Sequence, residues 1–410
     1  NTGFFQFMAT GNPNLFCIEV DDAAFSTTNW STDVDAQANF SESCATIAIP
    51  DTNFEQALID LGFDTNGLNG NILQTQAEAV TFLDVSSKSI FSLEGIEGFV
   101  NLTILVCQDN NLPSLDVSNN LALVQLVCRN NQLSSIDVSL HTFLENLDCL
   151  NNQIETLDLS NNTALTALIA ETNQLESLNI KNGNNENVTF FNAVNNPNLI
   201  CIEVDDAAYS ITNWSTNINI DAQANFSENC GTIAIPDTNF EQALIDLGID
   251  TNGLNGNMFQ FQAEAVTTLD VSAKNISNLQ GIEAFINLEV LRCQGNNLTS
   301  LNVSSNLALQ QLNCRNNLLT ALDVSSNTDL KILNCFSNQI IDLDLSNNVA
   351  LTSLLCDDNE LENLNVKNGN NENVTLFSAV NNPKLNCIEV DDVAYSNTDW
   401  SNGIDTQTSF

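Results

Sequence analysis

A pattern of 21 residues repeats in tandem along this chain. It is clearest in four consecutive segments: "LTILVCQDNNLPSLDVSNNLA" from Leu102, "LVQLVCRNNQLSSIDVSLHTF" from Leu123, "LENLDCLNNQIETLDLSNNTA" from Leu144 and "LTALIAETNQLESLNIKNGNN" from Leu165. Their shared pattern is L-x-x-L-x-C-x-x-N-x-L-x-x-L-D-V-S-x-N-x-x. One segment has too little apolar surface to fold alone, so neighbouring segments must stack and bury each other's leucine rows.

The pattern resembles the leucine-rich repeat, with cysteine in its third apolar position. The resemblance implies a β-rich solenoid with a parallel sheet on the concave face, slim convex turns and little helix except short cap helices. Alternation along a strand predicts that Leu105 and Cys107 point inward, while Ile104 and Val106 point outward. The repeated asparagines form a row whose amides can satisfy backbone groups at the turns.

A longer repeat encloses the short one. The stretch "IAIPDTNFEQALIDLGFDTNGLNGN" at Ile47 returns almost unchanged at Ile233, an offset of 186 residues. We therefore predict a window on a tandem array. Residues 1–44 are the tail cap of a preceding unit, 45–230 are a complete unit, and 231–410 are a second unit truncated in its tail cap. The alternative is two duplicated domains with frayed ends.

The complete unit is predicted to have a cap helix at about 51–62, repeats at about 80–200 and a tail cap at 201–230. The stretch "DTNFEQALIDLG" from Asp51 combines a helix-capping residue, apolar residues at helical spacing and a closing glycine, which is typical of a short amphipathic helix. This order of cap helix, slim repeats and tail cap resembles the internalin-type proteins that bacteria export.

The cysteines fall into two groups. The first group occupies the core position of the repeats. Stacked cysteines could form a ladder of disulfides or of metal ligands. Stacked coils would hold these side chains parallel and ~4.8 Å apart, which suits packing better than disulfide geometry. Ala170 fills the same position, so a small apolar group suffices. We expect buried free thiols at Cys107, Cys128, Cys149, Cys293, Cys314, Cys335 and Cys356.

The second group brackets the tail caps. We predict two disulfides there, Cys17 with Cys44 and Cys201 with Cys230, each stabilising its cap by roughly 3–4 kcal/mol. Disulfides imply an oxidising, extracellular compartment. By the same spacing, Cys387 should find its partner four residues beyond Phe410.

The charge balance excludes some partners. There are 51 acidic residues and 9 basic ones, which gives a formal net charge of −42. Such a surface repels nucleic acids and anionic membranes, since phosphates need lysine and arginine to displace their counterions. We also find no run of ~20 apolar residues, the length that crosses a bilayer. The sequence predicts neither a nucleic-acid partner nor membrane insertion.

The residues offer little support for an enzyme or a cofactor. The one histidine, His141, stands where other repeats carry asparagine, and no phosphate-cradling glycine loop precedes a strand and helix. Two loops, "DTNGLNGN" at Asp64 and at Asp250, resemble a calcium loop, with Asn66 and Asn252 as further ligands. The loop then has an extra residue, and Gln76 stands where a bidentate glutamate is needed. We therefore expect a decayed turn with weak calcium affinity at best.

The outward residues of the predicted sheet differ between the units. The second unit places two of the chain's three arginines there beside an aromatic residue, a combination typical of interface anchors. The simple alternative is drift on a solvated face. The candidate binding residues are Arg292, Gln294, Asn313, Arg315, Asn334, Phe336 and Asp357.

These observations lead to two functional hypotheses. The first is a non-enzymatic repetitive segment of a large secreted cell-surface protein, acting as adhesin, stalk or extracellular fibre. Its partners would be other units of the same array, and one form of this hypothesis is that the chain self-assembles. The second is a receptor-like module that binds a protein or glycan through its concave face.

Overall fold

A computed structural model describes residues 6–215 and 219–410 of the chain. The chain divides into two compact units, Asn1–Glu228 and Asn229–Phe410, called here the first and second unit. The first five residues of the predicted 1–44 segment lie outside the described ranges. No helix in those ranges is long and apolar enough to cross a membrane.

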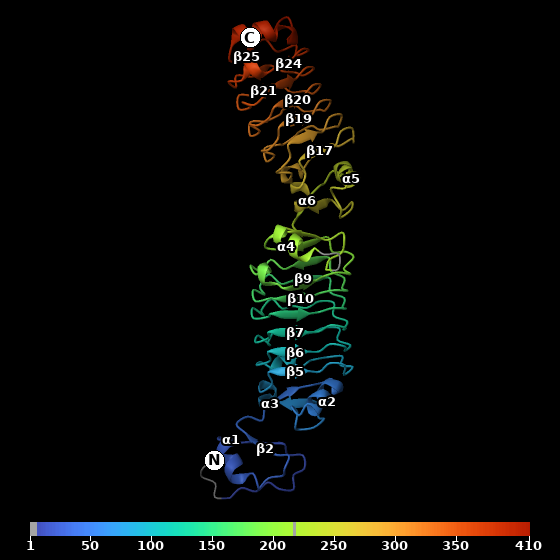
Figure 1. The fold of residues 1–410 in the computed structure, drawn as a ribbon, viewed down its shortest axis with the longest axis vertical. Coiled ribbons are helices and arrows are strands. Elements are labelled where there is room, and N and C mark those ends of the chain that lie inside the picture. Colours follow the sequence, from blue (N-terminus) through green and yellow to red (C-terminus); the bar gives the residue numbers. More distant parts are fainter. Residues whose placement is uncertain (1–5, 216–218) are drawn as a thin grey trace. The chain divides into compact units, whose positions relative to one another are not determined.

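The repeats of the first unit stack as coils, and each coil adds one short strand to a parallel sheet (Figure 1). Leu83, Leu105, Leu126, Leu147 and Leu168 are paired in register along this sheet. The strands, from one edge to the other, are β5 Phe82–Asp84, β6 Ile104–Val106, β7 Gln125–Val127, β8 Asn146–Asp148, β10 Ala167–Ile169 and β12 Phe190–Asn192.

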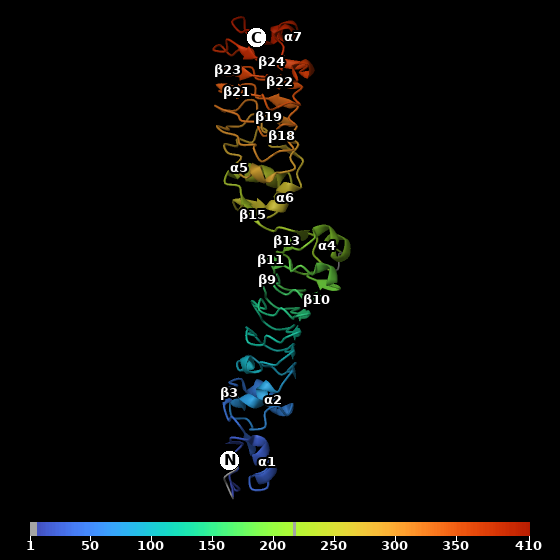
Figure 2. The same cartoon turned by 90° about the vertical axis from the view of Figure 1, so that its left-hand side faces the viewer.

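A second parallel sheet runs along another side of the same coils (Figure 2). It contains β9 Thr156–Asp158, β11 Ser177–Asn179, β13 Cys201–Glu203 and β14 Asn225–Ser227. Strands form at this side in the L-D-V-S segments of the later coils, while the corresponding stretches around Asp116 and Asp137 have no assigned strand.

The second unit repeats this plan. Its longer sheet contains β17 Thr268–Asp270, β18 Val290–Arg292, β19 Gln311–Asn313, β20 Ile332–Asn334, β22 Ser353–Leu355 and β24 Leu376–Ser378. The shorter sheet contains β21 Asp342–Asp344, β23 Asn363–Asn365 and β25 Ile388–Glu389.

A helical cap covers the first coil of each unit. Helix α2, Thr52–Asp60, begins at Asp51, whose side chain accepts hydrogen bonds from the backbone N–H groups of Asn53 and Phe54. It buries Phe54 and Leu58 against the first coil and ends before Gly62, which has φ of +78°. The second unit has the same helix as α5, Thr238–Asp246. The remaining cap elements are the antiparallel pairs β3 Thr46–Ala48 with β4 Asn71–Leu73 and β15 Thr232–Ala234 with β16 Asn257–Phe259, followed by α3 Gln74–Glu78 and α6 Gln260–Glu264.

The tail caps share a helix that starts at an aspartate and brings a tryptophan to the last coil. Trp214 stacks on Phe191 with ring centroids 4.7 Å apart, and Trp400 stacks on Phe377 at 4.3 Å. The helices are α1 Ala23–Trp30, α4 Ala207–Trp214 and α7 Val393–Asp399, and the strands of the first tail cap are β1 Cys17–Glu19 and β2 Asn39–Ser41. Short 3-10 turns lie at Ile96–Gly98, Asn185–Asn187, Ile282–Ala284, Asn371–Asn373 and Ser401–Gly403.

A row of buried asparagines ties each coil to the one before it. In Asn131, the amide nitrogen donates to the carbonyl oxygen of Cys128 in its own coil and to that of Cys107 in the preceding coil, both at 3.0 Å. Its amide oxygen accepts from the N–H of Leu112, also in the preceding coil. A side-chain amide suits this position because it offers two N–H donors and a separate carbonyl acceptor, and all three bonds are used here. Equivalent bonds are made by Asn110, Asn152, Asn173, Asn296, Asn317, Asn338 and Asn359.

A second buried row, on the convex turns, was not foreseen from the sequence. Asn162 donates to the carbonyl oxygens of Val138 and His141 at 2.9 and 2.8 Å. His141 takes the place of asparagine in this row: its side chain is 1% exposed, and its Nε2 lies 3.0 Å from the carbonyl oxygen of Val117. The other members are Asn120, Asn182, Asn306, Asn327, Asn348 and Asn368.

Removing one amide of the first row should be costly. In Asn152→Ala, the N–H of Leu133 loses its acceptor, which lies 3.0 Å away, and the carbonyl oxygen of Cys128 loses one of its donors. We expect a loss of about 2 kcal/mol in the free energy of unfolding, because a buried donor is left unsatisfied. Urea denaturation measures it. Asn161→Ala, at an exposed asparagine, is the control, and an equal loss in both variants would contradict the interlocking role.

Candidate functional site: the sheet face and the cap loop

The longer sheet of the second unit presents several of the predicted binding residues in one row. Strand pairing places Arg292 beside Asn313, Asn313 beside Asn334, and Asn334 beside Leu355. All four side chains are half-buried, whereas the leucine that precedes each of them on its strand is fully buried. The row is therefore a fixed surface whose spacing is set by the backbone hydrogen bonds of the sheet.

A second row follows where the chain leaves the strands. It contains Gln294 and Phe336, both half-buried, and Arg315, which is exposed. Asn313 and Asn334 shape this turn, since their side-chain oxygens accept from the N–H groups of Arg315 and Phe336 at 3.4 and 3.2 Å. Asp357 continues the row but is 9% exposed. It accepts hydrogen bonds from the Ser378 hydroxyl and the Val380 N–H, so its carboxylate is committed to the fold.

The two units differ in how their arginines are used. In the first unit, Arg129 lies 3.5 Å from Asp148. Apart from Asp148 itself, the row that contains it has apolar side chains in its middle and polar ones at its ends: Asp84, Val106, Val127, Ile169 and Asn192. Burial raises the pKa of Asp148, and the charge of Arg129 partly opposes the shift. In the second unit, neither Arg292 nor Arg315 makes an ion pair within the described ranges. Its sheet face therefore carries two arginines without an ion pair among the described residues, and Asp270 lies beside Arg292 in the sheet.

The cysteines of the coils are buried free thiols, and their carbonyl groups hold the first asparagine row. Burial raises the pKa of Cys107, Cys149 and Cys293 to about 12, so thiolate is negligible at neutral pH. Cys387 is also a free thiol but is exposed.

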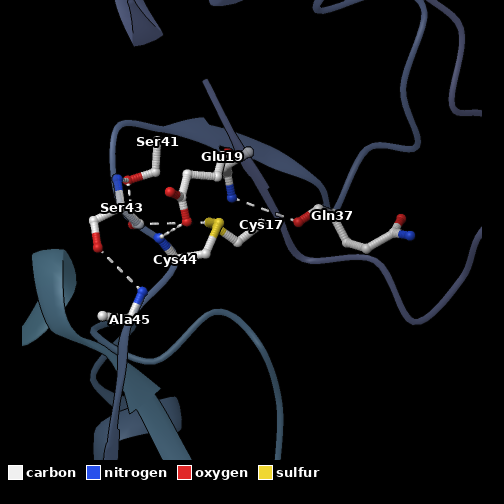
Figure 3. Close-up of a disulfide and its surroundings, with 8 residues drawn as sticks. Cys17, Glu19, Gln37, Ser41, Ser43, Cys44 and Ala45 are labelled. Atoms are coloured by element: carbon white, nitrogen blue, oxygen red, sulfur yellow. Dashed lines mark hydrogen bonds between the residues drawn. A yellow bond between two sulfur atoms is a disulfide. The ribbon is translucent and has the colours of Figure 1, made fainter. Parts of the chain in front are cut away.

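The first tail cap contains a disulfide (Figure 3). Cys17 and Cys44 are bonded with Cα atoms 5.8 Å apart, and the Cys44 N–H lies 3.4 Å from a carboxylate oxygen of Glu19. The bond joins the strand Cys17–Glu19 to the segment that follows Asn39–Ser41. Cys201 and Cys230 each take part in a disulfide.

The predicted calcium ligands Asp64 and Asn66 lie in what we call the cap loop, residues 63–70, between α2 and β4. They are 3% and 5% exposed, and the N–H of Asn66 donates to Oδ1 of Asp64 at 3.0 Å. A residue that sequence analysis missed holds this loop. Oε1 of Glu55, on α2, accepts from the N–H groups of Asn69 at 2.7 Å, Gly70 at 2.5 Å and Asn71 at 3.2 Å.

The second cap loop, residues 249–256, repeats these contacts. Asp250 is 3% exposed, and Asn252 is half-buried. Oε1 of Glu241 accepts from the N–H groups of Asn255 and Gly256 at 2.7 and 2.6 Å. Within the described ranges, no group of three or more histidine, cysteine, aspartate or glutamate side chains could hold a metal ion.

The fold defines the class: stacked coils of 21 residues, each adding a short strand to a parallel sheet, form a leucine-rich repeat solenoid. No protein-family model and no curated protein matches the chain.

Solved structures similar in fold include internalins and another leucine-rich repeat protein. The functional domain of InlJ from Listeria monocytogenes, described as including a cysteine ladder, has a TM-score of 0.34 and 22% identity, covering 88% of this chain and 80% of that one. The internalin InlF of the same species has a TM-score of 0.29 and 21% identity, covering 84% and 92%. A Leptospira interrogans leucine-rich repeat protein has a TM-score of 0.28 and 17% identity, covering 77% and 85%. These values are low, so the fold assignment rests on the chain's own coils.

The burial of the coil cysteines can be checked by thiol titration. Ellman's reagent at pH 8 should react rapidly with one thiol per folded chain, Cys387, and with eight after denaturation without reductant. The seven buried thiols are protected because they are inaccessible and protonated. Cys387→Ser should abolish the rapid phase. Several rapidly reacting thiols in the folded chain would show that the coil cysteines are accessible.

The cap loop predicts an unusual pH dependence of stability. Burial raises the pKa of Asp64 from 3.8 to about 6; the Asn66 N–H opposes this shift, and the charge of Glu55 adds to it. A raised carboxyl pKa means that the folded state holds its proton more tightly, so the stabilisation is present at low pH and lost as pH rises through about 6.

In chelator-containing buffer at pH 7.5, Asp64→Asn should therefore raise the free energy of unfolding by about 2 kcal/mol. The gain should vanish near pH 3, below the ordinary aspartate pKa of about 3.9, where Asp64 is protonated in both folded and unfolded chains. Urea denaturation at the two pH values measures the effect. Asp116→Asn is the control, since hydrogen bonds from Ser118 lower the pKa of that carboxyl. A loss of stability in Asp64→Asn at pH 7.5 would contradict the prediction.

Proposed function

We propose that the chain is a non-enzymatic, extracellular segment of a repetitive surface protein that serves in adhesion. The observation that carries the proposal is the duplication of a whole unit, helical cap and sheet included, within one chain. Each unit closes its own core with its own cap, so units can be added in tandem without exposing the leucine rows. Tandem units suit a stalk or fibre that extends a binding surface from a cell.

The disulfides support the extracellular location. Cys17 and Cys44 are bonded, and bonds of this kind persist mainly in oxidising compartments. We propose that Cys201 and Cys230 form the equivalent bond of the next tail cap. The net charge of −42 suits a soluble surface protein, since mutual repulsion opposes non-specific association.

A receptor-like role for the second unit is supported by a separate observation. Its sheet face carries Arg292 and Arg315 without ion pairs, beside the half-buried ring of Phe336. An arginine that makes no internal ion pair is available to an acidic group on a partner, and arginine and aromatic side chains dominate the energy of many interfaces. We propose this face as the site for a protein or an acidic glycan.

The two roles can be separated by one adhesion assay. Beads coated with the chain are counted on surfaces that carry a glycan panel and on surfaces that carry the chain itself. If the sheet face binds, Arg292→Ala with Arg315→Ala should reduce adhesion at least about tenfold, since interface anchors of this kind contribute more than 1.4 kcal/mol.

The control removes the same charge elsewhere. Lys367→Ala with Lys384→Ala also removes two positive charges, but neither lysine belongs to the longer sheet. Lys367 follows a strand of the shorter sheet, and Lys384 pairs with Glu360 and Glu362. Equal losses in both double variants would point to net charge and overturn the sheet-face site. Adhesion to the chain itself that survives both variants would favour the stalk or fibre, and no adhesion to any surface would contradict the adhesive role.

A further inference from the structure

Each cap loop contains buried side-chain oxygens that lack a partner. In the first unit these are Oδ2 of Asp64, Oδ1 of Asn66 and Oε1 of Gln76, which have no hydrogen-bond partner in the described part of the chain. The second unit leaves the same atoms unpartnered in Asp250, Asn252 and Gln262, together with Oε2 of Glu241. Leaving a buried polar atom unpaired is unfavourable. Here several unpaired atoms are hydrogen-bond acceptors, and they belong to side chains of one loop and the helix after it.

Hydrogen bonds bring these residues to one place and fix their orientation. The Gln76 amide nitrogen donates to the Thr65 hydroxyl at 2.6 Å, which fixes this side chain of α3 against the loop residue between Asp64 and Asn66. The Asn66 amide nitrogen donates to Oδ1 of Asn71 at 3.1 Å. Each amide therefore uses its nitrogen within the loop and leaves its oxygen free. The second unit has the same bonds, Gln262 to Thr251 at 2.6 Å and Asn252 to Asn257 at 3.1 Å.

We propose that each cap loop is a calcium site, in which Asp64, Asn66, Gln76 and Glu55 supply side-chain oxygens in the first unit. Asp250, Asn252, Gln262 and Glu241 supply them in the second unit. The donors come from three elements, α2, the cap loop and α3, so a bound ion would join the cap helix to the edge of the first coil.

The chemistry of the donors selects a hard cation. All of them are carboxylate or amide oxygens, without the nitrogen or sulfur ligands that zinc and copper prefer. Calcium accepts six to eight such oxygens in irregular geometry, whereas magnesium requires a near-ideal octahedron and keeps several waters. The mixture of two carboxylates and two amides in a folded loop suits calcium better.

The electrostatics of the loop also favour a bound cation. Asp64 and Glu55 both face the cap loop and are 3% and 1% exposed. Two buried carboxylates in one loop repel each other, and a positive charge between them relieves that repulsion. A divalent ion would supply this charge and satisfy the unpartnered oxygens.

Gln76 had suggested a decayed site, because a bidentate glutamate usually closes a calcium loop. The structure places a second carboxylate, Glu55, on the preceding helix. The glutamine then serves as a neutral oxygen ligand held by Thr65. Two negative ligands per site, fewer than in high-affinity loops, point to an affinity in the range of extracellular modules, Kd of about 10⁻⁴–10⁻³ M.

Calcium titration of the full chain by isothermal calorimetry tests the proposal, with magnesium as the comparison ion. We expect about two calcium ions per chain, one for each cap loop. Asp250→Asn should leave about one, and Asp64→Asn with Asp250→Asn should leave none. Calcium should also raise the melting temperature of the wild-type chain, because it binds the folded loops, and should not raise it in the double variant.

A control separates specific sites from diffuse attraction to an acidic surface. Asp116→Asn with Asp323→Asn removes the same two charges at exposed positions and should keep both sites. Gln76→Glu with Gln262→Glu should tighten binding about tenfold, because an added ligand charge raises calcium affinity. This gain cannot arise from misfolding. Equal loss of binding in the control, or unchanged binding in Asp64→Asn with Asp250→Asn, would overturn the proposal.

Discussion

The hydrogen bonds from buried asparagine amides to two successive coils are the interaction on which the rest of this structure depends. Each cysteine carbonyl oxygen of the coils lies where the chain turns away from the sheet, and asparagine supplies its donors. Asn131 reaches the carbonyl oxygens of Cys107 and Cys128 and thus fixes the distance and register between neighbouring coils. The leucine rows and the rows of outward side chains follow from that register.

The core could be predicted from the sequence because its signal is local. The L-x-C alternation correctly placed Leu105 and Cys107 inside and left Ile104 and Val106 half-exposed. The secondary structure of the L-D-V-S segments was harder to predict, because nearly the same residues form a strand at Thr156–Asp158 but not around Asp116. His141 looked like variation in a turn, because the buried carbonyl oxygen that it contacts belongs to another coil.

The cap loop shows where comparison with a sequence motif fails. A linear calcium loop expects its ligands at fixed intervals, and by that standard Gln76 counted against the site. Glu55 precedes Asp64 on another element, and folding brings its Oε1 to the N–H groups of Asn69 and Gly70. Contacts of this kind depend on how a helix packs on a loop, which spacing along the chain does not encode.

The two units are nearly identical in the cap loop and different on the sheet face, and the physical costs explain the contrast. A change at Asp64 or Asn66 would remove an oxygen of the proposed calcium site, and a change at Glu55 would leave the N–H groups of Asn69 and Gly70 without their acceptor. A change at the half-exposed position occupied by Val106 in one unit and Arg292 in the other costs little stability. The near-identity of the caps therefore fits a fold and a proposed ion site that both units share. The sheet face is the part of each unit that can acquire its own partner while the coils beneath it stay the same.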